Sequence, residues 1–155
     1  MKKAFTIIEL MLYMGIFSIL IAVLSGMFVS IMELQLSTHS NSEVTQAQNY
    51  IFSRLQYDLY RTQSITVPAL PGNSGSVLTL SIGGQPYTYQ ISGNNLVLNS
   101  YILNSPDVSI TDFIVTSLGT AGKPNVRINL TVQSNVTPLN KSPETVTLTQ
   151  SFTLK

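Results

Sequence analysis

The sequence contains no cysteine, and its single histidine is His39. Without cysteine no disulfide can cross-link the chain, and the usual zinc sites, which need several cysteines and histidines, are excluded. Charge is also scarce, because charged residues make up 10% of the chain and the formal net charge is +1. A strongly basic surface of the kind that binds nucleic acid or lipid headgroups is therefore not expected. Burial of apolar side chains has to hold the fold together.

The scarcity of charge is most extreme near the N-terminus. Residues 10–32 contain no ionisable side chain other than Tyr13, and Glu9 stands at the start of this stretch. A helix over these residues measures about 35 Å, which is enough to cross a hydrocarbon core of about 30 Å. A carboxylate costs about 2.5–3.5 kcal/mol at the centre of a membrane helix and less near its edge. A chain that keeps Glu9 here is expected to hold a partner for it.

Three interpretations of this segment are open. Lys2 and Lys3 precede it, so the positive-inside bias keeps the N-terminus in the cytoplasm and places the rest of the chain outside. A cleaved secretory signal would have an acid-free apolar region of about 7–15 residues before a small-residue cleavage site. A plain signal anchor would keep the helix in the membrane and would have no use for Glu9. The length of the span and the position of Glu9 favour a third interpretation.

The third interpretation depends on a motif at the N-terminus, which reads Lys2-Lys3-Ala4 and then Phe5-Thr6-Ile7-Ile8-Glu9-Leu10. This motif resembles the class III leader of type IV pilins and of the pseudopilins of type II secretion. The resemblance implies that a prepilin peptidase cleaves between Ala4 and Phe5, that the new amine of Phe5 is methylated, and that Glu9 is kept for assembly. Two positions depart from the family pattern. Ala4 stands where glycine is usual, and Gly26 lies near the place of a helix-breaking proline in many major pilins.

Physical chemistry gives Glu9 a role that agrees with the resemblance. Cleavage before Phe5 would remove both leader lysines and create a positive amine at the start of a helix. The backbone N–H groups of a first helical turn and this amine both favour a nearby anion. Glu9 lies four residues further on, so it can meet its own amine or that of a neighbouring helix. Since an unpaired charge is costly in a low dielectric, pairing between neighbours would fix their axial register.

Small residues form a second pattern within the span. They recur at spacings of three and four and would lie along one face of a helix: Gly15, Ser18, Ala22, Ser25, Gly26 and Val29. The pair Ala22 and Gly26 has the small-x-x-x-small spacing that lets two helices approach closely. Glycine and serine are also common in membrane helices in general, so packing and chance stay open as explanations. The packing hypothesis assigns Gly15, Ser18, Ala22 and Gly26 to contacts between helices.

Helical periodicity continues after the span, over residues 37–63. Apolar residues recur at spacings of three and four, at Val44, Ala47, Ile51, Leu55 and Leu59. Arg54, Asp58 and Arg61 lie on another side of this helix, where they can form ion pairs. A polar patch at residues 37–43 separates this stripe from the span. We expect one mostly continuous helix, with the alternative that Ser40 and Glu43 form a capping box that starts a second helix.

Residues 64–155 change to strands and turns. Prolines and glycines at 68–75 predict a loop, and alternating apolar and polar residues then predict strands at 76–82, 87–92, 96–103, 108–118, 126–133 and 145–154. Short connections between them predict an antiparallel sheet with one buried face. The apolar stripe of the helix is the candidate to cover that face. The predicted fold class is therefore α+β, with a long N-terminal helix, membrane-spanning in its first half, packed on an antiparallel β-sheet head in a pilin-like arrangement.

Chemistry-bearing residues are few. His39 lies in the polar patch with Glu43 four residues away, and we interpret it as a solvated helix residue. Asp107 has a turn context that leaves a calcium site open as an alternative. No catalytic, cofactor or nucleotide motif occurs, so no enzyme activity and no cofactor are predicted. A single-pass protein of the cytoplasmic membrane is predicted, with its N-terminus in the cytoplasm and its head outside.

The resemblance implies a structural subunit, a minor pilin or pseudopilin, of a pilus or secretion filament. Its parts would be a leader at 1–4, a transmembrane and assembly helix at 5–36, an amphipathic continuation at 37–63 and a head at 64–155. The implied partners are the prepilin peptidase, other pilin or pseudopilin subunits, the inner-membrane assembly platform, and membrane lipid before assembly; no nucleic acid is predicted. The alternative is a membrane-anchored extracytoplasmic binding domain that does not polymerise.

Overall fold

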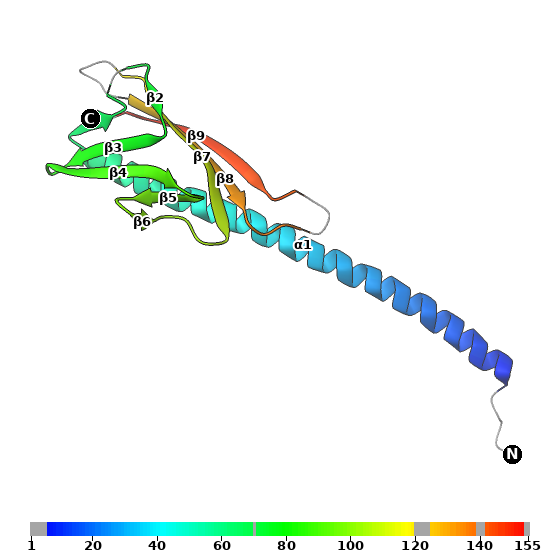
Figure 1. The fold of residues 1–155 in the computed structure, drawn as a ribbon. Coiled ribbons are helices and arrows are strands. Elements are labelled where there is room, and N and C mark those ends of the chain that lie inside the picture. The colour runs from blue at the N-terminus through cyan, green and yellow to red at the C-terminus, as the bar shows by residue number, and fades with distance from the viewer. Residues whose placement is uncertain (1–5, 70, 120–124, 139–141, 154–155) are drawn as a thin grey trace. The chain divides into compact units, whose positions relative to one another are not determined.

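The computed structural model describes residues 6–69, 71–119, 125–138 and 142–153. One long helix, α1 (Ile7–Arg61), is followed by strands that are arranged in two sheets (Figure 1). The chain divides into two compact units, Met1–Leu36 and Ser37–Lys155, which are described separately below. The combination of a long apolar helix and antiparallel sheets confirms the predicted α+β class.

Helix α1 runs for 55 residues, and residues 27–61 contain neither glycine nor proline to interrupt it. The polar patch at residues 37–43 remains helical, so the alternative of a second helix starting there is wrong. Ser40 does not act as a cap, because its side chain is buried and its Oγ has no hydrogen-bond partner in the described part of the chain. The helix ends where Thr62 Oγ1 and the Gln63 N–H both donate to the carbonyl oxygen of Ser81, at 3.0 and 2.9 Å.

The first sheet has the order β1-β3-β4-β5-β6 and the second has the order β2-β7-β8-β9, and every pair is antiparallel. The first contains β1 (Ser64–Val67), β3 (Val77–Ile82), β4 (Gln85–Ser92), β5 (Asn95–Leu98) and β6 (Tyr101–Ile102). The second contains β2 (Ser74–Gly75), β7 (Val108–Ser117), β8 (Asn125–Ser134) and β9 (Thr145–Thr153).

These strands differ from the predicted ones in three respects. Two sheets form where a single sheet was expected, and the expected loop at 68–75 is flanked by β1 and contains β2. The strand expected at 96–103 is divided into β5 and β6 by a two-residue turn. Its residues, Asn99 and Ser100, have φ angles of 47° and 79°. Positive φ at both central positions is the geometry that closes a tight hairpin, and asparagine tolerates it better than most residues.

The core of the head lies between the second half of α1 and the two sheets. The helix buries the predicted stripe at Val44, Ile51, Leu55 and Leu59, with Ala47 half-buried beside it. The sheets contribute alternate residues, as expected for strands with one buried face: these include Leu78, Leu80, Tyr89, Leu96, Phe113, Val115, Ile128, Leu130 and Val132. No cysteine is present, so this packing holds the head without a disulfide.

A buried carboxylate connects the helix to the first sheet. Asp58 was expected on a side of the helix away from the apolar stripe, but it is 0% exposed. Its Oδ2 accepts hydrogen bonds from Arg54 Nε at 3.0 Å and from the Tyr89 hydroxyl at 2.5 Å. Tyr89 lies on β4, so the bond crosses from the helix to the strand. A buried charge is tolerated only when it is paired and hydrogen-bonded. The two donors provide this for Oδ2, while the buried Oδ1 has no hydrogen-bond partner among the described residues.

The same cluster shifts the pKa of both donors. Burial raises the pKa of the Tyr89 hydroxyl well above its usual value, and the bond to the Asp58 carboxylate raises it further. For Arg54, partial burial lowers the pKa, but attraction to Asp58 and the hydrogen bonds to Tyr89 and Asp58 outweigh burial and leave it raised. Tyr89 therefore stays neutral, as a donor, and Arg54 stays charged.

We predict that Tyr89→Phe costs about 1–3 kcal/mol of stability, since it removes a donor from a buried carboxylate. The cost should also depend on pH. Above about pH 10 an unfolded chain loses the Tyr89 proton while the folded chain keeps it, so stability falls as pH rises, by at most about 1.4 kcal/mol per pH unit. Tyr89→Phe has no hydroxyl to titrate, so its stability should fall less steeply above about pH 10 than that of the wild type. Urea unfolding of both full-length chains in micelles at pH 8 to 11 measures the difference, and parallel curves would contradict it.

Candidate functional site

The candidate site is the apolar N-terminal part of α1. Every residue from 6 to 32 is exposed in the single chain, although nearly all of them are apolar or small. By length and composition the segment can cross a membrane, and none of its most apolar 18 residues is buried. Exposure of so much apolar surface to water is unfavourable, at about 25 cal/mol per Å². Lipid or other protein has to cover this surface.

Glu9 lies in the first turn of the helix and takes part in capping its N-terminus. The Glu9 N–H donates to Thr6 Oγ1 at 3.3 Å, and Glu9 Oε2 accepts from the Thr6 N–H at 3.5 Å. This reciprocal pair is a capping box, in which a threonine N-cap and a glutamate three residues later satisfy each other's backbone donors. The Thr6 carbonyl also accepts from the N–H groups of Glu9 and Leu10, at 3.1 and 3.2 Å. The carboxylate therefore points back toward the N-terminus of the helix.

The sequence suggested a capping box at Ser40 and Glu43 only as an alternative to a continuous helix, and the capping box at Thr6 and Glu9 was missed. The signal was present, because Thr6-Ile7-Ile8-Glu9 has the threonine-x-x-glutamate spacing before an apolar run. The two serine or threonine residues differ in their position in the helix and in burial. Ser40 is covered by the head and lies inside a continuous helix, whereas Thr6 stands at the true start of that helix. Ala4 and Phe5, the predicted cleavage residues, lie outside the described part of the chain.

The small residues of the span lie on the helix without distorting it. Ser18 Oγ donates to the carbonyl of Met14 at 2.7 Å, and Ser30 Oγ donates to the carbonyl of Gly26 at 3.1 Å. These bonds satisfy both hydroxyls inside the helix, which suits an apolar environment. A Cβ added at Gly15 or Gly26 would meet nothing within 4 Å. Packing among the described residues therefore requires neither glycine.

Comparison with known proteins bears on the same residues. Residues 1–25 match a family model described as the prokaryotic N-terminal methylation motif. The N-terminus is that of a type IV pilin or pseudopilin precursor. This match confirms the family that the leader and the first turn of the helix resemble, and it fits an apolar helix that serves as a single-pass membrane anchor. No curated protein and no solved structure matches the chain.

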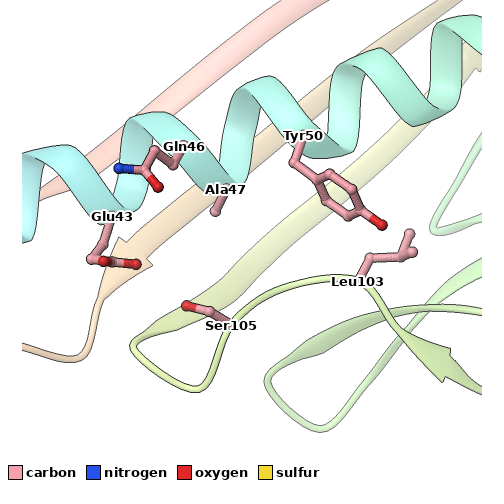
Figure 2. Close-up of a pocket in the computed structure, with 6 residues that line it drawn as sticks. All are labelled: Glu43, Gln46, Ala47, Tyr50, Leu103 and Ser105. Atoms are coloured by element: carbon pink, nitrogen blue, oxygen red, sulfur yellow. The ribbon is translucent and has the colours of Figure 1, made fainter.

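The head also has a shallow groove between α1 and the segment that leads into β7 (Figure 2). Its lining residues are Glu43, Gln46, Ala47, Tyr50, Leu103 and Ser105. His39 Nε2 lies 3.9 Å from Glu43 Oε1, and the Asp107 N–H donates to Ser105 Oγ at 3.3 Å. Within the described ranges, no group of three or more histidine, aspartate or glutamate side chains could hold a metal ion.

We predict that Thr6→Ala loosens the first turn of the helix, because it removes the hydroxyl that accepts from the Glu9 N–H. Loss of an N-cap costs about 0.5–2 kcal/mol. Amide hydrogen exchange of the full chain in micelles should become roughly three- to thirtyfold faster at residues 8–10 and stay unchanged beyond Tyr13. Thr6→Ser is the control, since serine caps equally well. Unchanged exchange in Thr6→Ala would contradict the capping role.

Proposed function

We propose that this chain is a minor subunit of a type IV pilus-like or type II secretion filament, which is inserted in the cytoplasmic membrane as a precursor and assembled through α1. The observation that supports this proposal is the pairing of a methylation motif with an apolar first half of α1 that no described residue covers. The prepilin peptidase cuts between Ala4 and Phe5 and methylates Phe5. Like helices then replace lipid around the helix, with the inner-membrane assembly platform as a further partner.

Glu9 is the residue on which assembly depends in this proposal. Its carboxylate already points toward the N-terminal end of the helix, where removal of residues 1–4 would create a positive amine. The capping bond from the Thr6 N–H is long, at 3.5 Å, so the carboxylate has bonding capacity left for that amine or for the amine of a neighbouring subunit. Pairing with the neighbour sets the axial position of one subunit against the next, since a mismatch leaves a charge unpaired in a low dielectric.

The first test separates the charge of Glu9 from its capping role. We predict that Glu9→Gln preserves the helix start, because glutamine can also serve at the third position of a capping box, but lowers filament yield at least about tenfold. Yield is measured by electron microscopy and by the sheared fraction in cells with the cognate assembly machinery. Glu9→Asp, which keeps a charge, should retain more filaments than Glu9→Gln. Filaments at wild-type yield in Glu9→Gln would contradict the role of the charge.

Mass spectrometry of the same samples tests the processing step. The proposal requires a mature chain that begins with methylated Phe5 in the wild type and in Glu9→Gln, so that loss of filaments cannot be ascribed to loss of cleavage. A wild-type chain that keeps Met1 and is found only in the membrane would favour the alternative, a membrane-anchored extracytoplasmic binding domain that does not polymerise.

The small-residue face forms the contact between helices in this proposal, at Gly15, Ser18, Ala22 and Gly26. We predict that Gly26→Leu leaves the single chain at least as helical, because leucine is favoured over glycine in a helix by about 1 kcal/mol and a Cβ at this position meets no described atom within 4 Å. Filament yield should nevertheless fall, since the added side chain blocks close approach. Leu24→Phe adds bulk to the opposite face and should assemble normally. Circular dichroism in micelles and filament yield measure the two effects; equal yields for both variants would refute the contact.

A further inference from the structure

The apolar part of α1 carries a shallow cleft close to its N-terminal end. Four side chains line this cleft from one side of the helix, and they are Leu10, Tyr13, Met14 and Phe17. Each of them is more than half exposed in the single chain. Two aromatic rings and a thioether make the cleft suited to an aromatic group, because rings and methionine sulfur both pack favourably against another ring.

The carboxylate of Glu9 lies next to the N-terminal end of this cleft. Its Oε2 accepts from the Thr6 N–H at 3.5 Å, so the side chain points back toward the start of the helix. Leu10 and Tyr13 follow Thr6 by four and seven residues, which places Thr6 on the same side of the helix, one turn before the cleft. The carboxylate and the apolar cleft are therefore adjacent parts of one surface.

A ligand that fits both parts of this surface carries a positive group and an aromatic ring close together. Cleavage between Ala4 and Phe5 would create such a group, because it leaves an ammonium and a benzyl side chain on one residue. The chain's own Phe5 does not suit the cleft. Tyr13 follows it by eight residues, or about 12 Å of helix, which is beyond the length of one phenylalanine side chain. A neighbouring copy has to supply the group.

We propose that Phe5 of a neighbouring mature copy docks on this surface, with its amine on Glu9 and its ring in the cleft. This inference rests on the leader cleavage of the proposed function, and it adds a binding site for the side chain to the ion pair. The neighbour lies about four residues, or about 6 Å, further along the helix, because its Phe5 is level with Glu9. Both helices run in the same direction, so the two copies can share one membrane. Each copy gives its amine to one neighbour and receives an amine from another, which is an open-ended arrangement.

Charge complementarity favours this occupant over lipid. An acyl chain can fill an apolar cleft, but it leaves the Glu9 carboxylate unpaired, which is costly in a low dielectric. A lipid amine comes with a phosphate, whose negative charge opposes the carboxylate. Only the N-terminal residue of a mature copy brings a positive charge and a ring without an accompanying anion. The site therefore distinguishes a mature copy from a precursor, since Phe5 has no amine before cleavage.

Photo-cross-linking of the mature chain in liposomes tests the docking. The photoreactive residue p-benzoyl-phenylalanine replaces Phe17, and half of the copies carry an isotope label, so that cross-links between copies can be recognised by mass spectrometry. The probe should join to the N-terminal peptide of another copy at least about tenfold more often than the same probe in place of Ile19. Ile19 is also exposed and lies on the opposite side of the helix at a similar depth, so it is the matched control. Equal yields at the two positions, or cross-links to lipid only, would overturn the proposal.

Two further samples with the probe at position 17 test the role of the amine. The uncleaved precursor should give only the yield of the Ile19 control, because its Phe5 carries no amine. Mature Glu9→Gln should lose most of the product, since the amine has no carboxylate to bind. A precursor that cross-links as well as the mature chain would overturn the proposal. These experiments need cleavage but no assembly machinery, so they can fail while the chain still forms filaments. A chain that the peptidase does not cleave would overturn the docking and the proposed function together.

Discussion

Uncovered apolar surface on the first half of α1 is the constraint on which the rest of this molecule depends. Exposure of residues 6–32 to water is unfavourable, because nearly all of them are apolar or small. The polar groups of this segment are hydrogen-bonded within the helix, which suits an apolar environment. Serine hydroxyls bond back to the helix, and the first turn satisfies its own donors through Thr6 and Glu9. Glu9 is the one charged group that remains in this stretch, and its position at the end of the helix limits the cost of keeping it.

The second half of the same helix stabilises the head, which has no disulfide. It does so with an apolar stripe that two sheets cover, and with a buried carboxylate that a strand residue and a helix residue share. The stripe supplies most of the stabilisation, because apolar burial is the dominant favourable term in folding. The hydrogen bond from the Tyr89 hydroxyl to Asp58 Oδ2 adds a specific contact between the helix and β4.

Much of this architecture could be predicted from the sequence, because the spacing of apolar residues indicates which face of a helix or strand is buried. The helix stripe at Val44, Ile51 and Leu55 and the alternation along β8 each identified a buried face correctly. Two features escaped prediction for physical reasons. The division into two sheets depends on how the strands twist and pack, which alternation does not encode. Burial of Asp58 depends on a partner far away in the sequence, Tyr89, which local spacing cannot reveal.

The functional part of the chain was predictable to a different degree. The leader and the position of Glu9 form a short, local motif, so they could be recognised without knowledge of the fold. The capping bond at Thr6 was equally local but was missed, whereas a cap at Ser40 stayed open as an alternative because only the fold reveals that Ser40 is buried.

The position of the N-cap has a consequence for maturation. Thr6 and Glu9 both lie downstream of the expected scissile bond, so the peptidase removes none of the groups that start the helix. Cleavage at that bond would therefore replace the two leader lysines with a single ammonium group and would leave both capping residues of the first helical turn in place.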